Sequence, residues 1–346
     1  MFSIKSQLKK LYLNLIFNTS NSYKKQESNN KNSIYIIGTP SHGNLGDQAI
    51  ALAQHKFCEE FFSDFNVIEV QDFETYKLLK GIRSNINKDD LFFFHGGGNF
   101  GNLYSSAQEN RKFVLKKIPN QRFFLFPQSI YFTKDRQGIK ELKNTQNYID
   151  KKDIVLFLRE KVSFELSREF FKAPSVLTPD IVTFLEINSV EKSREGIVFL
   201  LRNDIEKNVS EDYFEKLINI LRKENNIVLS DTHVGDENII YKEKREKILI
   251  DFWNKLSSKE LIITDRLHGM IFGYITKTPT IVFDNNNGKI SASYNTWFTD
   301  IDYIKYVDNS ISVDEIVHII DEFKKEKFDF NRIDYDFEKM ANIIRK

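Results

Sequence analysis

The feature of this sequence that most constrains its fold is a short apolar run that ends in a glycine-rich turn and leads into a helical pattern. Residues 34–37 (IYII) precede the turn GTPSHGNLGD at residues 38–47, and apolar residues then recur with helical spacing from Ala49 to Phe57. Strands that are apolar throughout are typical of parallel sheets covered on both faces. A turn from such a strand into a helix directs backbone N–H groups and a helix N-terminus toward an anion.

The same alternation of strand and helix recurs along the chain. Strand-like runs occur at residues 67–70, 91–94, 122–126 and 154–158, with helical segments at 48–62, 73–79, 110–117 and 161–171. A second series has strands at 197–201, 227–229, 260–264 and 280–283, with helices near 212–224, 242–256 and 268–275. This pattern predicts an α/β fold of two doubly wound, Rossmann-like domains that face a shared cleft, where open parallel sheets bind ligands.

The length of 346 residues is sufficient for two such domains. We predict a basic amphipathic segment and polar linker at residues 1–32, and an N-terminal α/β domain at residues 33–185. A C-terminal α/β domain follows at residues 186–320, and a helical tail occupies residues 321–346.

The composition argues against several classes of protein. A net charge of +1 argues against a general nucleic-acid binder, and the single cysteine, Cys58, excludes an internal disulfide. The sequence shows no Cys/His spacing typical of zinc, and no apolar run reaches the ~18–20 residues that span a bilayer. We therefore expect a cytoplasmic protein with no metal site and no nucleic-acid partner.

The N-terminal segment is ambiguous. Residues 1–17 combine apolar side chains with Lys5, Lys9 and Lys10, a pattern typical of an amphipathic helix on an anionic membrane surface. The same pattern fits a helix docked on its own domain, so both interpretations stay open.

Five polar segments directly follow predicted strands and carry the candidate chemistry. They are residues 42–47 (HGNLGD), 95–102 (HGGGNFGN), 127–129 (PQS), 159–163 (REKVS) and 265–269 (DRLHG). Arg159 and Arg266 are candidates for binding a phosphate, and His268 at a helix N-terminus can bind an anion or deliver a proton near neutral pH. Taken singly, Arg159 fits a surface ion pair equally well and the glycines fit an ordinary tight turn. The first turn is neither a P-loop nor a G-x-G-x-x-G fingerprint.

Taken together and in this order, the five segments resemble the polysaccharide pyruvyl transferase family over residues 33–290. The resemblance implies a fold like that of the two-domain GT-B glycosyltransferases. It also implies transfer of the pyruvyl unit of phosphoenolpyruvate to sugar hydroxyls, which forms a ketal and releases phosphate. Phosphoenolpyruvate is then a donor substrate, and no separate cofactor is expected.

The resemblance also implies roles for individual residues. His268 would be the general acid that protonates the donor, and Asp47 the general base that activates an acceptor hydroxyl. Arg159 and Arg266 would bind the anionic donor. The remaining predicted substrate-binding residues are His42, Asn44, Gly97, Gly98, Asn99, Gln128 and Ser129.

The acceptor implied by the family is an oligosaccharide of a cell-surface polymer, often linked to undecaprenyl diphosphate at the cytoplasmic face of the membrane. Two other functions remain open from sequence. One is a GT-B-type glycosyltransferase that uses a nucleotide sugar, and the other is a non-catalytic component of polysaccharide assembly.

Overall fold

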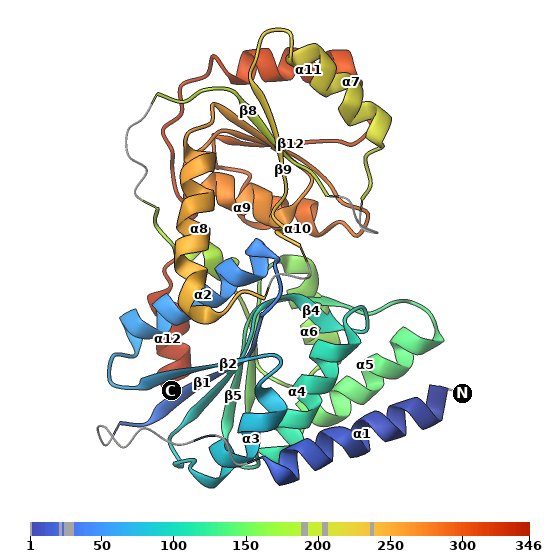
Figure 1. The fold of residues 1–346 in the computed structure, drawn as a ribbon, viewed down its shortest axis with the longest axis vertical. Helices are drawn as coiled ribbons and strands as arrows, with labels where there is room; N and C mark the ends of the chain where they lie inside the picture. Colours follow the sequence, from blue (N-terminus) through green and yellow to red (C-terminus); the bar gives the residue numbers. More distant parts are fainter. Residues whose placement is uncertain (1, 21–22, 24–30, 188–192, 203–206, 236–238) are drawn as a thin grey trace.

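Two parallel β-sheets, each flanked by helices, organise the computed structural model, which describes residues 2–20, 23, 31–187, 193–202, 207–235 and 239–346. The first sheet has the strand order β2-β1-β3-β5-β6-β7, with β4 paired to β5, and the second has the order β12-β11-β10-β8-β9. Every strand pair is parallel. The predicted α/β architecture with two doubly wound halves is therefore confirmed (Figure 1).

The first half supplies the seven-stranded sheet. Its elements are β1 (Ser33–Thr39), α2 (Leu45–Phe61), β2 (Asn66–Gln71), α3 (Thr75–Ser84), β3 (Leu91–Phe94), β4 (Gly97–Gly101), α4 (Ser105–Lys117), β5 (Arg122–Tyr131), α5 (Arg136–Ile149), β6 (Ile154–Leu158), α6 (Lys161–Phe170), β7 (Ser175–Leu177) and the 3₁₀ turn η1 (Ile181–Phe184).

The second half supplies the five-stranded sheet and the C-terminal helices. Its elements are β8 (Ile197–Leu200), α7 (Glu211–Leu221), β9 (Ile227–Ser230), α8 (Lys242–Ser257), β10 (Leu261–Thr264), α9 (Leu267–Ile275), β11 (Thr280–Phe283), α10 (Lys289–Trp297), β12 (Ile304–Val307), α11 (Val313–Phe323) and α12 (Glu338–Arg345).

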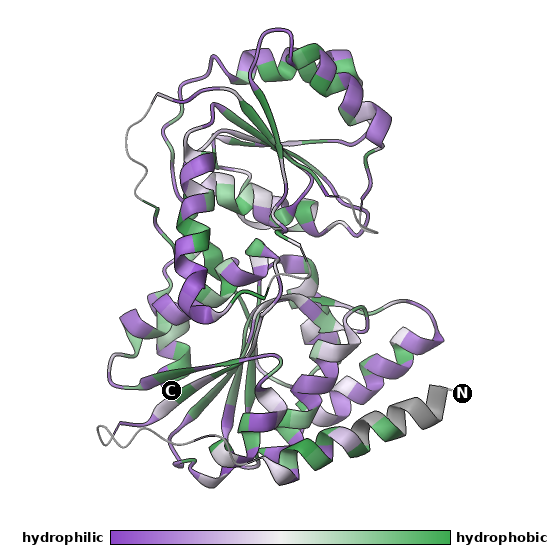
Figure 2. Ribbon diagram, viewed as in Figure 1, coloured by the Kyte–Doolittle hydropathy of each residue, from purple (hydrophilic) through white to green (hydrophobic). Residues whose placement is uncertain are grey.

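The central strands are apolar throughout because both faces of the first sheet are covered (Figure 2). Ile34 and Ile36 of β1 belong to one hydrophobic cluster, whereas Tyr35 and Ile37 belong to another on the opposite face. Aromatic rings stack between neighbouring strands, for example Phe93 on Phe124 at 5.0 Å between ring centroids. The first of these clusters continues into the second half through α8 and α9, so the two halves share buried apolar surface.

The C-terminal tail returns to the first half (Figure 1). Met340, Ala341 and Ile344 of α12 are buried in the shared hydrophobic cluster, and Arg345 forms an ion pair with Asp64 at 2.7 Å. Helix α11 runs across the predicted boundary between the C-terminal domain and the tail, which lies between residues 320 and 321. The domain limits drawn from sequence remain predictions, and most of the predicted linker lies outside the described residues.

Some predicted elements differ from the structure. Helix α4 begins at Ser105 rather than residue 110, and α3 covers Thr75–Ser84 rather than residues 73–79. The glycine segment follows β3, but it is not only a turn, because Gly97–Gly101 forms strand β4 along β5. Residues 127–129, expected to follow a strand, lie inside β5. Within the described ranges, none of the helices has both the length and the apolar character that crossing a membrane requires.

Helix α1 (Phe2–Thr19) packs against α3 and the neighbouring α4. Phe17 near its end is buried and contacts the ring of Phe113 edge-on. The expectation that the N-terminal segment docks on its own domain is met along this inner face.

A buried ion pair joins the two halves beside the first glycine-rich turn. Arg245 of α8 donates hydrogen bonds of 2.6 and 2.8 Å to both carboxylate oxygens of Glu69 on β2. Its Nε donates to Gln48 of α2, whose amide in turn donates to the carbonyl oxygens of Pro40 and His42. Arg245 therefore helps to hold the turn that carries the first predicted site segment.

We expect Glu69→Gln to lower the free energy of unfolding by about 3 kcal/mol, because it leaves the buried guanidinium of Arg245 without a counter-charge. The double variant Glu69→Leu/Arg245→Met removes both charges and should regain most of that loss. Chemical denaturation of the two variants and the wild type measures the difference. An equal loss in the single and double variants would show that the charge pair is not the cause.

The same pair predicts a pH dependence. Burial alone would raise the pKa of Glu69, but the hydrogen bonds and charge of Arg245 hold that pKa below its usual value. The stabilisation is therefore complete above the ordinary carboxyl pKa and disappears as the pH falls through the lowered value. The double variant should lack this part of the acid dependence.

Candidate active site

The first glycine-rich turn lies where the two halves meet. Asn44 caps helix α2, because its side chain accepts hydrogen bonds from the backbone N–H groups of Gly46 and Asp47. The Asn44 backbone also forms an antiparallel bridge to His233 of the second half. Gly43 passes so close to Gly235 that a side chain at position 43 would overlap its carbonyl. The segment at residues 230–233, at the end of β9, therefore borders the site.

Gly46 makes room for His268. A methyl group at position 46 would overlap the imidazole ring at Nδ1, so the absence of a side chain lets α2 pack directly on the histidine of the second half. Gly46 and Asp47 are consecutive at the start of α2, and His268 is the second residue of α9. This packing brings the predicted acid and the predicted base into one site.

The charges around His268 come from both halves. Asp180 lies 3.7 Å from Nε2 of His268, and that nitrogen has no hydrogen-bond partner among the described residues. Burial lowers the pKa of His268; the Asp180 carboxylate opposes this effect, while the Arg159 guanidinium adds to it. Asp47 and Arg266 are also close enough to affect the same pKa. The imidazole is therefore biased toward its neutral form.

Arg159 is buried and held from several sides. Its Nη1 donates to Asp180 at 2.7 Å and its Nε donates to the Ser129 hydroxyl at 2.7 Å. Ser129 in turn donates to Glu160, whose pKa is raised by burial. Ser129 therefore helps to orient Arg159. Asp180 lies between Arg159 and His268 and was not predicted from the sequence.

The triple-glycine segment brings backbone close to these groups. The point where a Cβ of Gly97 would stand is 3.4 Å from Oδ1 of Asp47. The corresponding point at Gly98 is 3.2 Å from Nη2 of Arg159 and 3.6 Å from Nζ of Lys289. Lys289 begins α10 of the second half, and it too was missed by the sequence reading. Two cations from different halves therefore converge at Gly98.

The other predicted residues are brought to the same region with different partners. Arg266 pairs with Asp231 at 2.8 Å within the second half. Gln128 and Arg111 both donate hydrogen bonds of 2.7 Å to Asn99. His42 lies 3.7 Å from Asp47, and the side chains of His42 and Asp47 are 43% and 28% exposed. The site is thus open to solvent on the side of these two residues.

Asp180 and Lys289 carry no motif that would single them out in sequence. Each is one charged residue in an ordinary strand-end or loop segment. Only the shared position at the carboxyl ends of the strands could have pointed to them.

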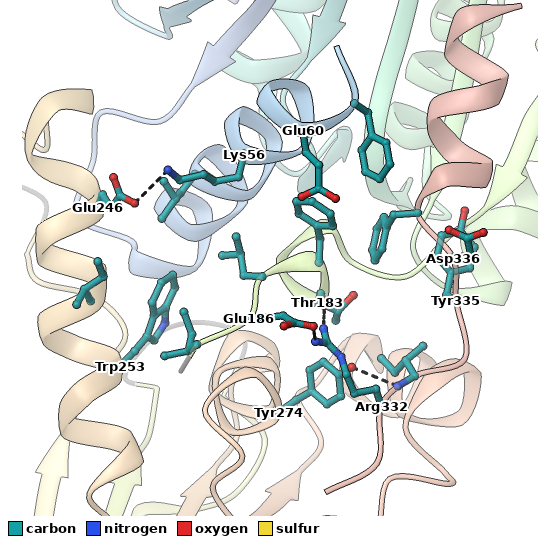
Figure 3. A pocket seen from close by; sticks show the side chains of 18 residues that line it. Lys56, Glu60, Thr183, Glu186, Glu246, Trp253, Tyr274, Arg332, Tyr335 and Asp336 are labelled. Carbon is teal, nitrogen blue, oxygen red and sulfur yellow. Dashed lines mark hydrogen bonds and ion pairs between the residues drawn. The ribbon is translucent and has the colours of Figure 1, made fainter. Parts of the chain in front are cut away.

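A separate groove of about 860 Å³ lies on the outer side of α2, between α8 and the C-terminal segment (Figure 3). Lys56, Trp253, Tyr274 and Arg332 are among the residues that line it. None of the predicted site residues belongs to its wall. Among the residues with described positions, no group of three or more His, Cys, Asp or Glu side chains is arranged to hold a metal ion.

We expect Gly46→Ala to displace the His268 ring, lower turnover about 100-fold and lower stability, because an angstrom-scale misplacement of a reacting group has costs of that order. In a His268→Ala background the overlap is absent, and alanine in the helix should stabilise by up to about 1 kcal/mol. Thermal unfolding of the four proteins in this cycle measures the reversal of sign. The same sign in both backgrounds would show that Gly46 does not serve to accommodate His268.

Comparisons with known proteins agree with this architecture. The chain resembles, with a TM-score of 0.57 and 21% identity, a functionally uncharacterised protein from Klebsiella pneumoniae, covering 89% of this chain and 99% of that one. It also resembles the UDP-GlcNAc 2-epimerase of Methanocaldococcus jannaschii, with a TM-score of 0.51 and 13% identity over 91% of this chain and 98% of that one. At these identities the likeness concerns the fold, and it confirms the predicted GT-B-like arrangement.

The sequence comparisons concern the family. General stress protein 30 of Bacillus subtilis is 34% identical over 317 residues, which cover 91% of this chain and 92% of that protein. Pyruvyl transferase 1 of Schizosaccharomyces pombe is 30% identical over 280 residues, covering 76% and 69% of the two chains. The family model described as polysaccharide pyruvyl transferase matches residues 44–287, a range that includes Asp47, Arg159 and His268. The chain belongs to the polysaccharide pyruvyl transferase family.

Proposed function

We propose that this pyruvyl transferase uses phosphoenolpyruvate as its donor and forms a pyruvate ketal on two hydroxyls of a sugar in a cell-surface polysaccharide or its precursor. The observation that carries the proposal is the convergence of His268, Asp47 and two cations, Arg159 and Lys289, at the junction of the two sheets. Phosphoenolpyruvate bears a phosphate and a carboxylate, and a pair of cations suits such a donor.

Each step of the proposed reaction has a group in the site. His268 gives a proton to the methylene carbon of the donor, which becomes a methyl group and leaves the neighbouring carbon electrophilic. Asp47 accepts the proton of the first sugar hydroxyl as it adds to that carbon. The second hydroxyl then displaces phosphate and gives its proton to that phosphate, so one donor and two hydroxyls give one ketal and one inorganic phosphate. The proton that Asp47 accepted from the first hydroxyl balances the one that His268 gave to the methylene carbon. Charge on the departing phosphate is met by Arg159 and Lys289.

The protonated state of His268 depends on the donor. Burial lowers the pKa of the imidazole. An anionic donor beside the ring favours the imidazolium form and so raises that pKa. In this proposal, binding of the donor and protonation of His268 are therefore coupled.

The acceptor in the proposal is an oligosaccharide of a cell-surface polymer, carried on undecaprenyl diphosphate at the cytoplasmic face of the membrane. The family to which the chain belongs supports the polysaccharide class of acceptor. Arg266 and its partner Asp231 lie on the second-half side of the site, and His42 and Asn99 on the first-half side.

We expect His268→Ala and Asp47→Ala each to lose turnover by at least about 100-fold while the fold is retained, since each removes a proton-transfer group. Release of inorganic phosphate from phosphoenolpyruvate with candidate acceptors measures turnover, and circular dichroism reports the fold. His55→Ala and Asp89→Ala, which lie outside the site, serve as matched controls. Ketal formation at a normal rate by either site variant would contradict its role. Release of nucleotide from a nucleotide sugar, without phosphate from phosphoenolpyruvate, would indicate a glycosyltransferase instead.

We expect Lys289→Gln to raise the KM for phosphoenolpyruvate about tenfold or more with a smaller effect on kcat, because a hydrogen bond to a charged group contributes about 1.5–3 kcal/mol. Lys216→Gln on the exposed face of α7 is the matched control. Steady-state kinetics with varied donor distinguishes the two parameters. An unchanged KM would remove Lys289 from the donor site.

A further inference from the structure

One face of helix α1 is apolar and uncovered. Leu8, Leu11, Tyr12 and Leu15 are 59%, 67%, 62% and 59% exposed, and their spacing places them on a single side of the helix. Every other helix in the described ranges carries at most one exposed large hydrophobic residue. We refer to these four residues as the α1 stripe.

The α1 stripe belongs to a helix that is fixed to the protein by its other side. Phe17 is buried against Phe113, and Lys80 donates a hydrogen bond of 2.6 Å to the backbone carbonyl of Asn18. Helix α1 lies at the outer edge of the first half, away from the second half (Figure 1). The stripe therefore faces outward from an anchored helix.

Basic residues lie beside the C-terminal end of this helix. Lys117 stands 4.4 Å over the Phe17 ring, and its pKa is lowered first by burial and then by the neighbouring charges of Lys116 and Arg83. Arg83 and Lys116 are exposed. The helix itself contributes Lys5, Lys9 and Lys10 to the sequence, and no acidic residue occurs before Glu27. The stripe therefore belongs to a helix whose sequence is basic and whose C-terminal end lies beside further cations.

We propose that the α1 stripe and the basic residues around it form a docking surface for an anionic lipid bilayer. Apolar side chains on one side of a helix enter the boundary between headgroups and acyl chains, while neighbouring cations attract anionic headgroups. The helix lies along the bilayer surface and does not cross it.

A second copy of the chain fits this surface less well. Specific stable interfaces bury about 1,200–2,000 Å² in total, and four side chains on one helix supply only part of such an area. Pairing two copies through the stripe would also bring two lysine-rich helices together, which like-charge repulsion opposes. Charge and area both favour the bilayer.

The test is partition of the full chain onto vesicles that contain phosphatidylglycerol, compared with pure phosphatidylcholine. We expect binding to the anionic vesicles that weakens as salt rises, and partition at least about tenfold lower for Leu11→Glu/Leu15→Glu. The control Ile220→Glu/Ile250→Glu makes the same charge change on exposed positions of α7 and α8, and it should bind like the wild type. Thermal unfolding of all variants verifies that they are folded.

A second variant tests the charge alone. Arg83→Gln/Lys116→Gln should weaken binding to anionic vesicles and reduce its salt dependence, whereas Lys223→Gln/Lys339→Gln should leave both unchanged. Equal partition of wild type and Leu11→Glu/Leu15→Glu would overturn the proposal. So would a wild-type dimer in sedimentation that the same variant abolishes, because the stripe would then join two copies.

The docking surface and the proposed reaction can fail separately. Leu11→Glu/Leu15→Glu should release phosphate from phosphoenolpyruvate with a water-soluble acceptor at the wild-type rate, because the stripe is exposed on α1 whereas the site lies where the two halves meet.

Discussion

The site depends on the direct packing of the start of α2 on the imidazole of His268. Helix α2, which carries Asp47, belongs to the first half, and His268 on α9 belongs to the second. The proposed acid and base therefore share a site only when the two halves are docked. Gly43 and Gly46 are the positions at which this docking needs the absence of a side chain. The ion pair between Arg245 and Glu69 and the hydrogen bonds of Gln48 then hold the same turn from behind. The glycines of the first segment are thus explained by contact between halves as much as by the conformation of the turn.

The buried charges of the site are largely compensated before any substrate enters. Arg159 has Asp180 and Ser129 as partners, and Arg266 has Asp231. Burying an ion without such partners would cost several kcal/mol. The same partners fix the orientation of each guanidinium, which directs Nη2 of Arg159 toward Gly98. Preorganised charge of this kind is what a reaction with a dianionic leaving group requires.

The architecture could be predicted from sequence because its central strands are apolar on both faces, a pattern with few alternative explanations. Strand β4 could not, since glycines carry little strand preference and its pairing depends on the neighbouring β5. The packing of α12 on the first half could not be predicted either, because the sequence of a short amphipathic helix does not indicate which hydrophobic core it packs against. The convergence of the five polar segments followed from a topological rule. The neighbours of these segments, Asp180 and Lys289, could not be predicted in this way. Each is a single charged residue that tertiary packing brings to the site.

The carboxylate partners of Arg159 and Arg266 affect how the proposed donor binds. In the proposed site the anionic donor meets Lys289 and Arg159, and the charge of Arg159 is already shared with Asp180, so these cations do not fully balance the charge of the donor. His268 is biased toward the neutral form by burial, with Asp180 and Asp47 acting in the opposite direction. Proton uptake by this imidazole would supply the missing positive charge at the place where the methylene carbon needs an acid. In the proposed reaction, Asp180 neutralises part of the charge of Arg159, so binding of the donor favours protonation of His268. That proton is the one that the methylene carbon then receives.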